Sequence, residues 1–212
     1  MKRMDKIILI GGGGHAKVLI DLIKTIEEYE IAGIVDPELE TGSQVFTIPV
    51  LGSDDVLPDL IARGIKTFCI AVGSVRDNSK RRELYMMVKN LGLSIPSLIH
   101  PGAVVSTMET SISDGVQIMA GAIIQAGTVV GENTIINTGA VIEHDCIIGR
   151  NVHVCPGAVI CGGSIIGDNA FIGAGSTIIQ YLEIGRDAFV GAGALVHRNL
   201  SDGALTRRIH SG

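Results

Sequence analysis

The 212-residue sequence is poor in aromatic side chains: Phe, Trp and Tyr together make up 3%, and tryptophan is absent. Hydrophobic residues still amount to 46%, so a core must be built mainly from Ile, Val and Ala. Glycine is abundant instead, with 28 residues, well above the average usage of about 7%. This composition predicts many turns or close backbone approaches, because glycine has no Cβ atom.

Further absences exclude several classes of function. The net charge is −5 and no basic stripe is present, so a nucleic-acid partner is not expected. No apolar run approaches the roughly 20 residues of a membrane-spanning helix, and the four apolar residues before Gly11 are too few for a signal peptide. The four cysteines form no CxxC and no zinc-type Cys/His spacing. We therefore expect a cytoplasmic protein with free thiols, without membrane insertion and without a metal.

A six-residue repeat occupies the second half of the chain. Ile or Val stands at every sixth position from Ile112 to Val196, fifteen times without a gap or insertion. The residue two positions earlier is mostly small, and the residue after the anchor is often Gly. This period is neither helical nor that of a simple strand. It predicts a short strand and a turn, repeated three times to close a triangular 18-residue coil. Five stacked coils would bury the β-branched anchors along the axis.

The first half of the chain has a different pattern, in which apolar strands alternate with helical segments. Strands are predicted at residues 6–10, 31–35 and 67–72, a turn or short strand at 49–52, and helices at 16–26, 54–63 and 79–91. Such an order indicates a small parallel α/β sheet. We therefore expect two domains, an α/β domain over residues 1–97 and an all-β parallel helix over residues 98–212. A purely structural solenoid, such as an antifreeze protein, would not explain the first half.

Residues 11–15 are four glycines followed by a histidine, placed between the first strand and the first helix. The N-terminus of a helix at such a place can hold phosphate. Read as Gly-x-Gly-x-x-Ala, the loop also fits the dinucleotide fingerprint, and Asp36 ends the next strand, where a ribose contact is expected. The α/β domain is short for two mononucleotide halves, so a mononucleotide site fits better. An NAD-dependent enzyme and a tight turn without a ligand are the alternatives.

Over nearly its whole length the sequence resembles the family of sialic acid O-acetyltransferases and nucleotide-4-amino-sugar N-acetyltransferases, which are hexapeptide-repeat acyltransferases. Besides the repeat, the matching pieces are residues 11–15, Asp36, residues 49–52, Gly73, residues 99–101 and residues 143–145. The resemblance implies a left-handed β-helix, a homotrimer with active sites between subunits, and acetyl-CoA bound by the β-helix. It also implies that the α/β domain binds a sugar nucleotide, whose 4-amino group receives the acetyl group for glycan biosynthesis.

His144 is the candidate general base. It falls in a predicted outward turn and has an acidic residue on either side. Histidine changes its charge near neutral pH, and an adjacent acid can orient the ring and stabilise the imidazolium. The resemblance identifies that acid as Asp145, although members of the family carry the longer Glu at this place, and Glu143 is the competing candidate.

The stacking of coils predicts further residues of this site. Residue 144 plus 18 is Gly162, one coil along, where a backbone N–H would face the oxyanion of the thioester carbonyl. His153 lies half a coil from His144 and could approach it only from a neighbouring subunit, and the family has a histidine there too. His153 and Gly162 are therefore also candidates for binding the cofactor. Ala174 and Ala192 are 18 residues apart and are expected in one column, beside the pantetheine arm of coenzyme A.

The resemblance also assigns the residues that bind the sugar nucleotide, with His15 turned toward the sugar. These substrate-binding candidates are Gly12, Gly13, Gly14, His15, Asp36 and Gly73. One departure concerns the C-terminal tail, where the family's Gly-x-Pro-Ala turn is missing and Arg207 and Arg208 are the candidates for phosphate contacts. Two other functions stay open: O-acetylation of sialic acid, and a non-catalytic scaffold that binds a sugar nucleotide.

Overall fold

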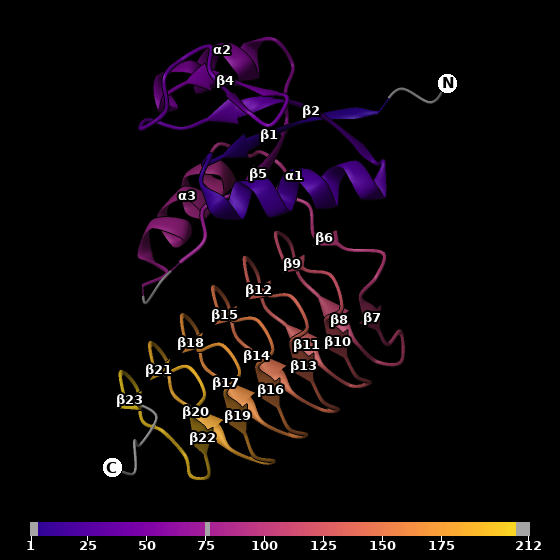
Figure 1. Ribbon diagram of the computed structural model, residues 1–212, viewed down its shortest axis with the longest axis vertical. Coiled ribbons are helices and arrows are strands. Elements are labelled where there is room, and N and C mark those ends of the chain that lie inside the picture. The colour runs from indigo at the N-terminus through magenta and orange to yellow at the C-terminus, as the bar shows by residue number, and fades with distance from the viewer. Residues whose placement is uncertain (1–3, 75–76, 207–212) are drawn as a thin grey trace. The chain divides into compact units, whose positions relative to one another are not determined.

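The computed structural model describes residues 4–74 and 77–206 and divides the chain into two compact units (Figure 1). The first unit consists of Met1–Gly73 and Lys80–Pro96, and the second of Ser74–Ser79 and Ser97–Gly212. The division therefore falls close to the predicted boundary after residue 97, but no motif or period in the sequence indicates that Ser74–Ser79 belongs with the second unit. Each unit is described by itself.

The first unit is an α/β domain around a five-stranded sheet of order β3-β4-β2-β1-β5. Its elements are β1 Asp5–Ile10, α1 Gly14–Ile26, β2 Tyr29–Val35, β3 Gln44–Val45, β4 Ile48–Gly52, η1 Asp54–Val56, α2 Leu57–Ala62, β5 Thr67–Ile70 and α3 Ser79–Asn90. β1 pairs in parallel with β2 and β5, and β2 pairs in parallel with β4. Only the short β3 is antiparallel to its neighbour, so the predicted parallel α/β sheet is confirmed.

The predicted helix over residues 54–63 is divided into the 3-10 turn η1 and the α-helix α2. Pro58 lies at the beginning of α2, where its missing N–H breaks no helical hydrogen bond. A proline at this point starts a new helix more readily than it continues an old one.

The order of the strands creates a switch point at β1. From β1 the chain passes first to β2 on one side, and later to β5 on the other side. Open parallel sheets bind their ligands outside the carboxyl ends of the strands at such points. Ile8 and Ile10 of β1 are buried against α2 and α3, while Ile7 and Leu9 point to the opposite face and are also fully buried.

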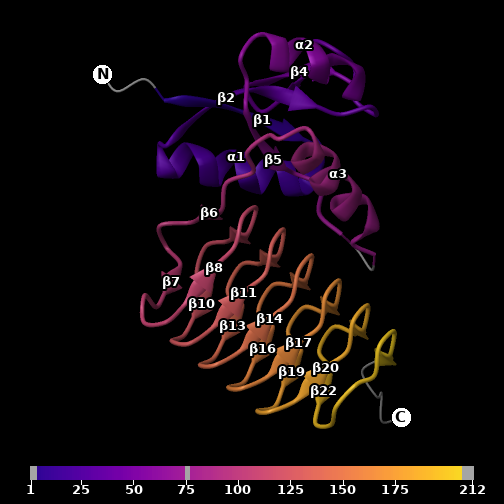
Figure 2. The same cartoon turned by 180° about the vertical axis from the view of Figure 1, so that it is seen from behind.

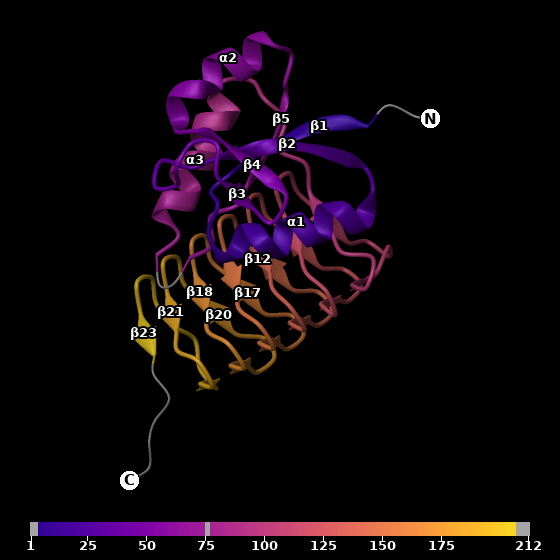
Figure 3. The ribbon, with the colours of Figure 1, turned by 45° about the horizontal axis from the view of Figure 1, so that its top comes forward.

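The second unit is a β-helix of three parallel sheets (Figures 2 and 3). From Ile112 to Val196, residues paired between coils are 18 apart, as in the pair Ile142 and Ile160. The strands are β6 Leu98–Ile99, β7 Val104–Val105, β8 Ser111–Ile112, β9 Gln117–Ile118, β10 Ile123–Ile124, β11 Val129–Val130, β12 Ile135–Ile136, β13 Val141–Ile142, β14 Ile147–Ile148, β15 His153–Val154, β16 Val159–Ile160, β17 Ile165–Ile166, β18 Phe171–Ile172, β19 Thr177–Ile178, β20 Glu183–Ile184, β21 Phe189–Val190, β22 Leu195–Val196 and β23 Leu205–Thr206.

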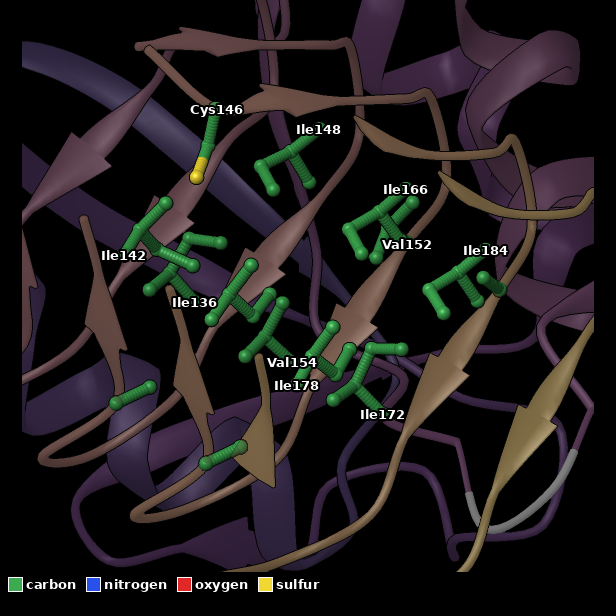
Figure 4. Packing of buried hydrophobic residues seen from close by; sticks show 14 of the residues in the cluster. Ile136, Ile142, Cys146, Ile148, Val152, Val154, Ile166, Ile172, Ile178 and Ile184 are labelled. Atoms are coloured by element: carbon green, nitrogen blue, oxygen red, sulfur yellow. The ribbon is translucent and has the colours of Figure 1, made fainter. Parts of the chain in front are cut away.

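The Ile/Val ladder forms the core of the β-helix (Figure 4). From Ile118 to Val196 every anchor is at most 3% exposed. The small residues at the corners are buried as well, and their hydroxyl groups satisfy turn carbonyls: Thr134 Oγ1 donates to Gly149 O at 2.9 Å, and Ser164 Oγ donates to Cys161 O at 2.8 Å. The repeat therefore has the role predicted for it.

The β-helix is longer than the strict repeat. β6 and β7 pair with β9 and β10 before the first predicted hexad. The step from Val105 to Ile112 is seven residues rather than six, and this one-residue insertion hides the additional strands from a search for an uninterrupted period.

Ser74–Ser79 is held on the β-helix by a buried asparagine. The Nδ2 group of Asn78 donates to the carbonyl oxygens of Asn151 at 2.7 Å and Asn169 at 3.2 Å. Asn78 is 4% exposed, and it connects two successive coils. The sequence contains no period or motif at this place that would predict the contact.

Candidate active site

His144 lies in the turn between β13 and β14, at one corner of the β-helix. Its Nδ1 atom is 2.8 Å from Asp145 Oδ2, and the two side chains are 55% and 72% exposed. A carboxylate only accepts hydrogen bonds, so Nδ1 must carry the proton that is donated to Asp145. The lone pair is then on Nε2, which is the atom a general base presents to its substrate.

The position of Asp145 follows from two local features. Its φ of 58° lies in the left-handed region, which Asp tolerates better than most residues. Its carboxylate lies over Gly127 of the preceding coil, where a Cβ atom would collide with Oδ1. The short Asp side chain therefore reaches the histidine ring, and the geometry favours Asp145 over Glu143 as the acid that orients it.

Gly162 lies under the imidazole ring of His144, as the 18-residue step predicts. A Cβ atom at this position would be 2.5 Å from His144 Nε2, so a residue other than glycine would displace the ring. The turn is fixed by two bonds, from Gly163 N to His144 O at 2.9 Å and from Tyr181 N to Gly162 O at 3.0 Å. Within the described residues no backbone carbonyl accepts a hydrogen bond from the N–H of Gly162. Its use as an oxyanion donor stays a prediction.

Tyr181 was missed by the sequence reasoning. It occupies the same corner one coil after Gly163, and its side chain is 73% exposed. A Cβ atom on Gly163 would be 2.5 Å from Tyr181 Cδ1, so the ring rests on this glycine. The signal was available, because 163 plus 18 is 181, the same step that leads from His144 to Gly162.

His153 belongs to β15, in the sheet that does not adjoin the corner of His144. It is 6% exposed, and its ring stacks edge-on against Phe171 at a centroid distance of 5.3 Å. Its Nδ1 is 2.6 Å from Ser74 Oγ and its Nε2 is 3.3 Å from Asn137 Nδ2. As expected, one chain does not bring His153 to His144. A role toward the cofactor stays a prediction.

Ala174 and Ala192 form a column of exposed turn residues, and Gly193 N donates to Ala174 O at 2.8 Å. Their turns follow β18 and β21, so this corner is not the corner of His144 and Gly162. A single chain therefore does not place the two alanines beside Gly162.

In the α/β unit, the glycine loop is tied to the end of β2. Asp36 Oδ2 accepts the N–H of Gly12 at 2.7 Å, and Oδ1 accepts the N–H of Glu38 at 2.8 Å. The carboxylate thus braces the loop in addition to any contact with a ligand. Two oxygens carry about four lone-pair sites, so Asp36 still has room for a ligand donor.

The four glycines of the loop differ in what they permit. Gly11 has a φ of 106° and approaches the backbone of Ala71, so both its conformation and its contacts require glycine. Gly13 and Gly14 have open space where a Cβ atom would stand. Gly13 caps α1 without a side-chain hydrogen bond, which leaves the helix N-terminus open to an anion.

The remaining predicted substrate residues lie at the same edge of the sheet. A Cβ atom on Gly73, just beyond β5, would be 3.2 Å from His15 Cβ, so His15 packs against this glycine. The six candidates are thus gathered at the carboxyl ends of β1, β2 and β5. Their contacts with a sugar nucleotide stay a prediction.

Arg81 supports this edge from inside the fold. Its Nη1 group donates to Ile70 O at 2.6 Å and to Val72 O at 3.1 Å. Burial lowers the pKa of the guanidinium to about 10. The sequence does not predict this role, because an arginine in a charged helix is expected to be exposed.

Cysteine and metal chemistry receive no support from the described residues. All four cysteines are free thiols, and burial raises the pKa of Cys155 to about 12 and also raises that of Cys146. A buried thiol with a raised pKa is a poor nucleophile. In residues 4–74 and 77–206 no group of three or more His, Cys, Asp or Glu side chains is arranged to hold a metal ion.

None of the described helices combines the length and the apolar character needed to cross a bilayer. Arg207 and Arg208, the candidates for phosphate contacts, lie outside the described residues.

Comparison with known proteins supports both halves of this description. Residues 6–88 match the PglD N-terminal domain, and residues 109–144, 127–162, 145–180 and 163–198 match the bacterial transferase hexapeptide (six repeats). A curated relative, the UDP-N-acetylbacillosamine N-acetyltransferase of Bacillus subtilis (strain 168), is 37% identical over 126 residues, which are 55% of this chain and 52% of that protein. The match thus spans about half of the curated relative.

Two solved structures are similar over almost the whole chain. A mutant of GDP-perosamine N-acetyltransferase from Caulobacter crescentus, in complex with CoA and GDP-perosamine, is 38% identical with a TM-score of 0.89, covering 97% of this chain and 94% of that one. The acetyltransferase domain of PglB from Neisseria gonorrhoeae FA1090, in complex with acetyl coenzyme A, is 34% identical with a TM-score of 0.87, covering 97% of both chains. These matches confirm the predicted α/β domain and left-handed β-helix. The chain therefore belongs to the hexapeptide-repeat sugar N-acetyltransferases that carry a PglD N-terminal domain.

Proposed function

We propose that the protein transfers the acetyl group of acetyl-CoA to the 4-amino group of a nucleotide-linked amino sugar, with His144 as the general base. The observation that carries this proposal is the hydrogen bond of 2.8 Å between His144 Nδ1 and Asp145. It directs Nε2 toward the space above Gly162, where glycine alone leaves room for the ring. The solved relatives with bound CoA, acetyl coenzyme A or GDP-perosamine support the assignment of both substrates.

The chemistry follows from these atoms. The amine nitrogen attacks the thioester carbonyl carbon, and a C–N bond forms as the carbonyl oxygen becomes an oxyanion. The N–H of Gly162 stabilises this oxyanion, while Nε2 takes the proton of the nitrogen and Asp145 stabilises the resulting imidazolium. The C–S bond then breaks and the proton passes from Nε2 to the thiolate of coenzyme A.

A homotrimer with active sites between its subunits would complete the site. On the sheet that contains β11, β14 and β17, Val129, Ile147 and Ile165 are 41%, 48% and 40% exposed. A second copy would bury this apolar column and gain hydrophobic free energy. Ala174 and Ala192 lie at another corner, so coenzyme A would contact them on a neighbouring subunit. His153 would likewise act on the site of a neighbour.

A cytoplasmic location fits the chemistry of the cysteines. The four thiols are free, and three of them are buried. Free thiols are typical of reducing compartments, where disulfides are rare.

The phosphates of the sugar nucleotide would be held by the glycine loop at the N-terminus of α1.

The test is the release of free thiol from acetyl-CoA with a panel of acceptors: UDP-, GDP- and dTDP-linked 4-amino sugars, and sialic acid. We expect turnover with one amino-sugar nucleotide and a loss of about 10²- to 10⁴-fold in His144→Ala. His197→Ala is the matched control, because His197 is also an exposed histidine but lies three coils beyond the turn of His144. Turnover with sialic acid alone would contradict N-acetylation, and tight sugar-nucleotide binding without turnover would favour the scaffold.

A further inference from the structure

Tyr181 has a backbone conformation that is unfavourable for a bulky residue. Its φ is 59°, and side chains of this size rarely adopt the left-handed region. The other non-glycine residues of the described β-helix with positive φ are all polar: Glu109, Asn133, Asp145, Asn151, Asn169 and Asp187. Strain of this kind persists where the surrounding structure imposes it, often at a functional site.

Contacts on both sides of a turn hold Tyr181 in place. Its N–H donates to Gly162 O at 3.0 Å, and the Cδ1–Cε1 edge of its ring rests on Gly163, 2.5 and 2.6 Å from where a Cβ atom would stand. Tyr181 is nevertheless 73% exposed. It therefore contributes little to the core, and most of its apolar surface is available to a ligand.

The ring lies beside the proposed reaction centre. His144 comes from the coil before the Gly162–Gly163 turn and covers Gly162, whereas Tyr181 comes from the coil after it and covers Gly163. Two aromatic rings thus flank one two-residue turn, which also carries the N–H of Gly162. An acyl group bound to this N–H would have the base on one side and the phenol ring on the other.

The chemistry decides which substrate meets which ring. The attacking nitrogen must lie on the His144 side of the carbonyl carbon, because Nε2 takes its proton. This leaves the Tyr181 side for the sulfur atom and the chain that follows it. We propose that the ring of Tyr181 packs against the mercaptoethylamine end of coenzyme A and so helps to bind the acyl donor, an inference that rests on the proposed function.

Direct binding tests this inference without turnover. By titration calorimetry with CoA, and with pantetheine as a shorter probe, Tyr181→Ala is expected to raise the Kd about ten-fold. Tyr181→Phe should bind like the parent, since the ring and not the hydroxyl makes the contact. Phe46→Ala is the matched control, because Phe46 is also an exposed aromatic residue, 61% exposed with a φ of 55°.

Three outcomes of the titration would overturn the inference. One is an unchanged Kd for CoA in Tyr181→Ala, and another is a weaker affinity for the sugar nucleotide instead. An affinity of Tyr181→Phe as low as that of Tyr181→Ala would also contradict a contact through the ring.

Chemical protection gives a second readout. Nitration with tetranitromethane, followed by peptide mass spectrometry, should modify Tyr181 rapidly in the free protein because this residue is 73% exposed. Tyr85, which is 3% exposed, should react slowly. CoA should protect Tyr181, and a sugar nucleotide should not. Protection of Tyr181 by CoA in a protein that transfers no acetyl group would contradict the proposed function alone. Acetyl transfer with no protection of Tyr181, and with an unchanged Kd for CoA in Tyr181→Ala, would contradict this inference alone.

Discussion

The two units build their sites by different means. In the α/β unit, the glycine loop, Asp36 and Gly73 come from the ends of β1, β2 and β5, whose adjacency depends on the order of the strands. In the β-helix, residues paired between coils are 18 apart, as in the pair Ile142 and Ile160. The same step leads from His144 to Gly162 and then to the turn of Tyr181. Position is set by long-range topology in the first unit and by a local period in the second.

This difference predicts how each site responds to mutation. At the corner of the β-helix, neighbouring coils are in direct contact, so a single methyl group added to Gly162 acts directly on the ring of His144. In the α/β unit, a side chain such as Asp36 acts through the loop that it braces. Changes in the β-helix should therefore alter the rate of the reaction, and changes in the α/β unit should alter the binding of the acceptor.

Of the changes that test this comparison between the units, Gly162→Ala is expected to have the largest effect. The new Cβ atom would stand 2.5 Å from His144 Nε2, so the ring must move. A displacement of about 1 Å can cost about 10²-fold in rate, and kcat should fall by about this factor while the unfolding midpoint stays unchanged. Gln180→Ala, at the equivalent corner position one coil along, is the control. A wild-type kcat in Gly162→Ala would show that His144 is not the base.

A smaller effect, of another kind, is expected for Asp36→Ala. Losing the acceptor of the Gly12 N–H bond should weaken the hold on the glycine loop and raise the Kd of the sugar nucleotide about ten-fold. The Kd of CoA should not change. Both are measurable by calorimetry, with the exposed Asp21→Ala as control. Equal losses for both ligands would mean that the division of labour between the units is wrong.

The smallest effect is expected for Asn78→Ala. The mutation removes the donor to the carbonyl oxygens of Asn151 and Asn169, at a cost of about 1 kcal/mol in the free energy of unfolding. Urea unfolding measures it, and Lys80→Ala, an exposed neighbour, is the control. If both variants unfold at the wild-type midpoint, Ser74–Ser79 contributes nothing to the stability of the β-helix.

The periodic part of the molecule was the easier to predict. The fifteen-fold Ile/Val ladder determines which residues face the axis and which coil follows which, so Gly162 could be placed beneath His144 by addition. The same step leads from Gly163 to Tyr181, but a tyrosine in a turn is not an acid, a base or a glycine, so its residue type alone does not mark it as part of the site. β6 and β7 were missed because one inserted residue interrupts the count.

The aperiodic contacts could not be predicted from the sequence. Arg81 binds the carbonyl oxygens of Ile70 and Val72, although its charge suggested an exposed position on α3. Ser74 approaches His153 Nδ1 to 2.6 Å over 79 residues of sequence. Both contacts depend on where the chain travels after a strand ends, and no local propensity determines that path.

The chain crosses between the two units three times, after Gly73, after Ser79 and after Pro96. The second unit is therefore not encoded by one continuous stretch of the gene. A single crossover that exchanged the first 96 codons would bring in a foreign version of the segment containing Ser74 and Asn78, and with it a foreign cover for His153. Recombination between relatives would preserve both units only where this short segment matches the coils that receive it. The α/β unit therefore cannot be exchanged as freely as the two-unit architecture suggests.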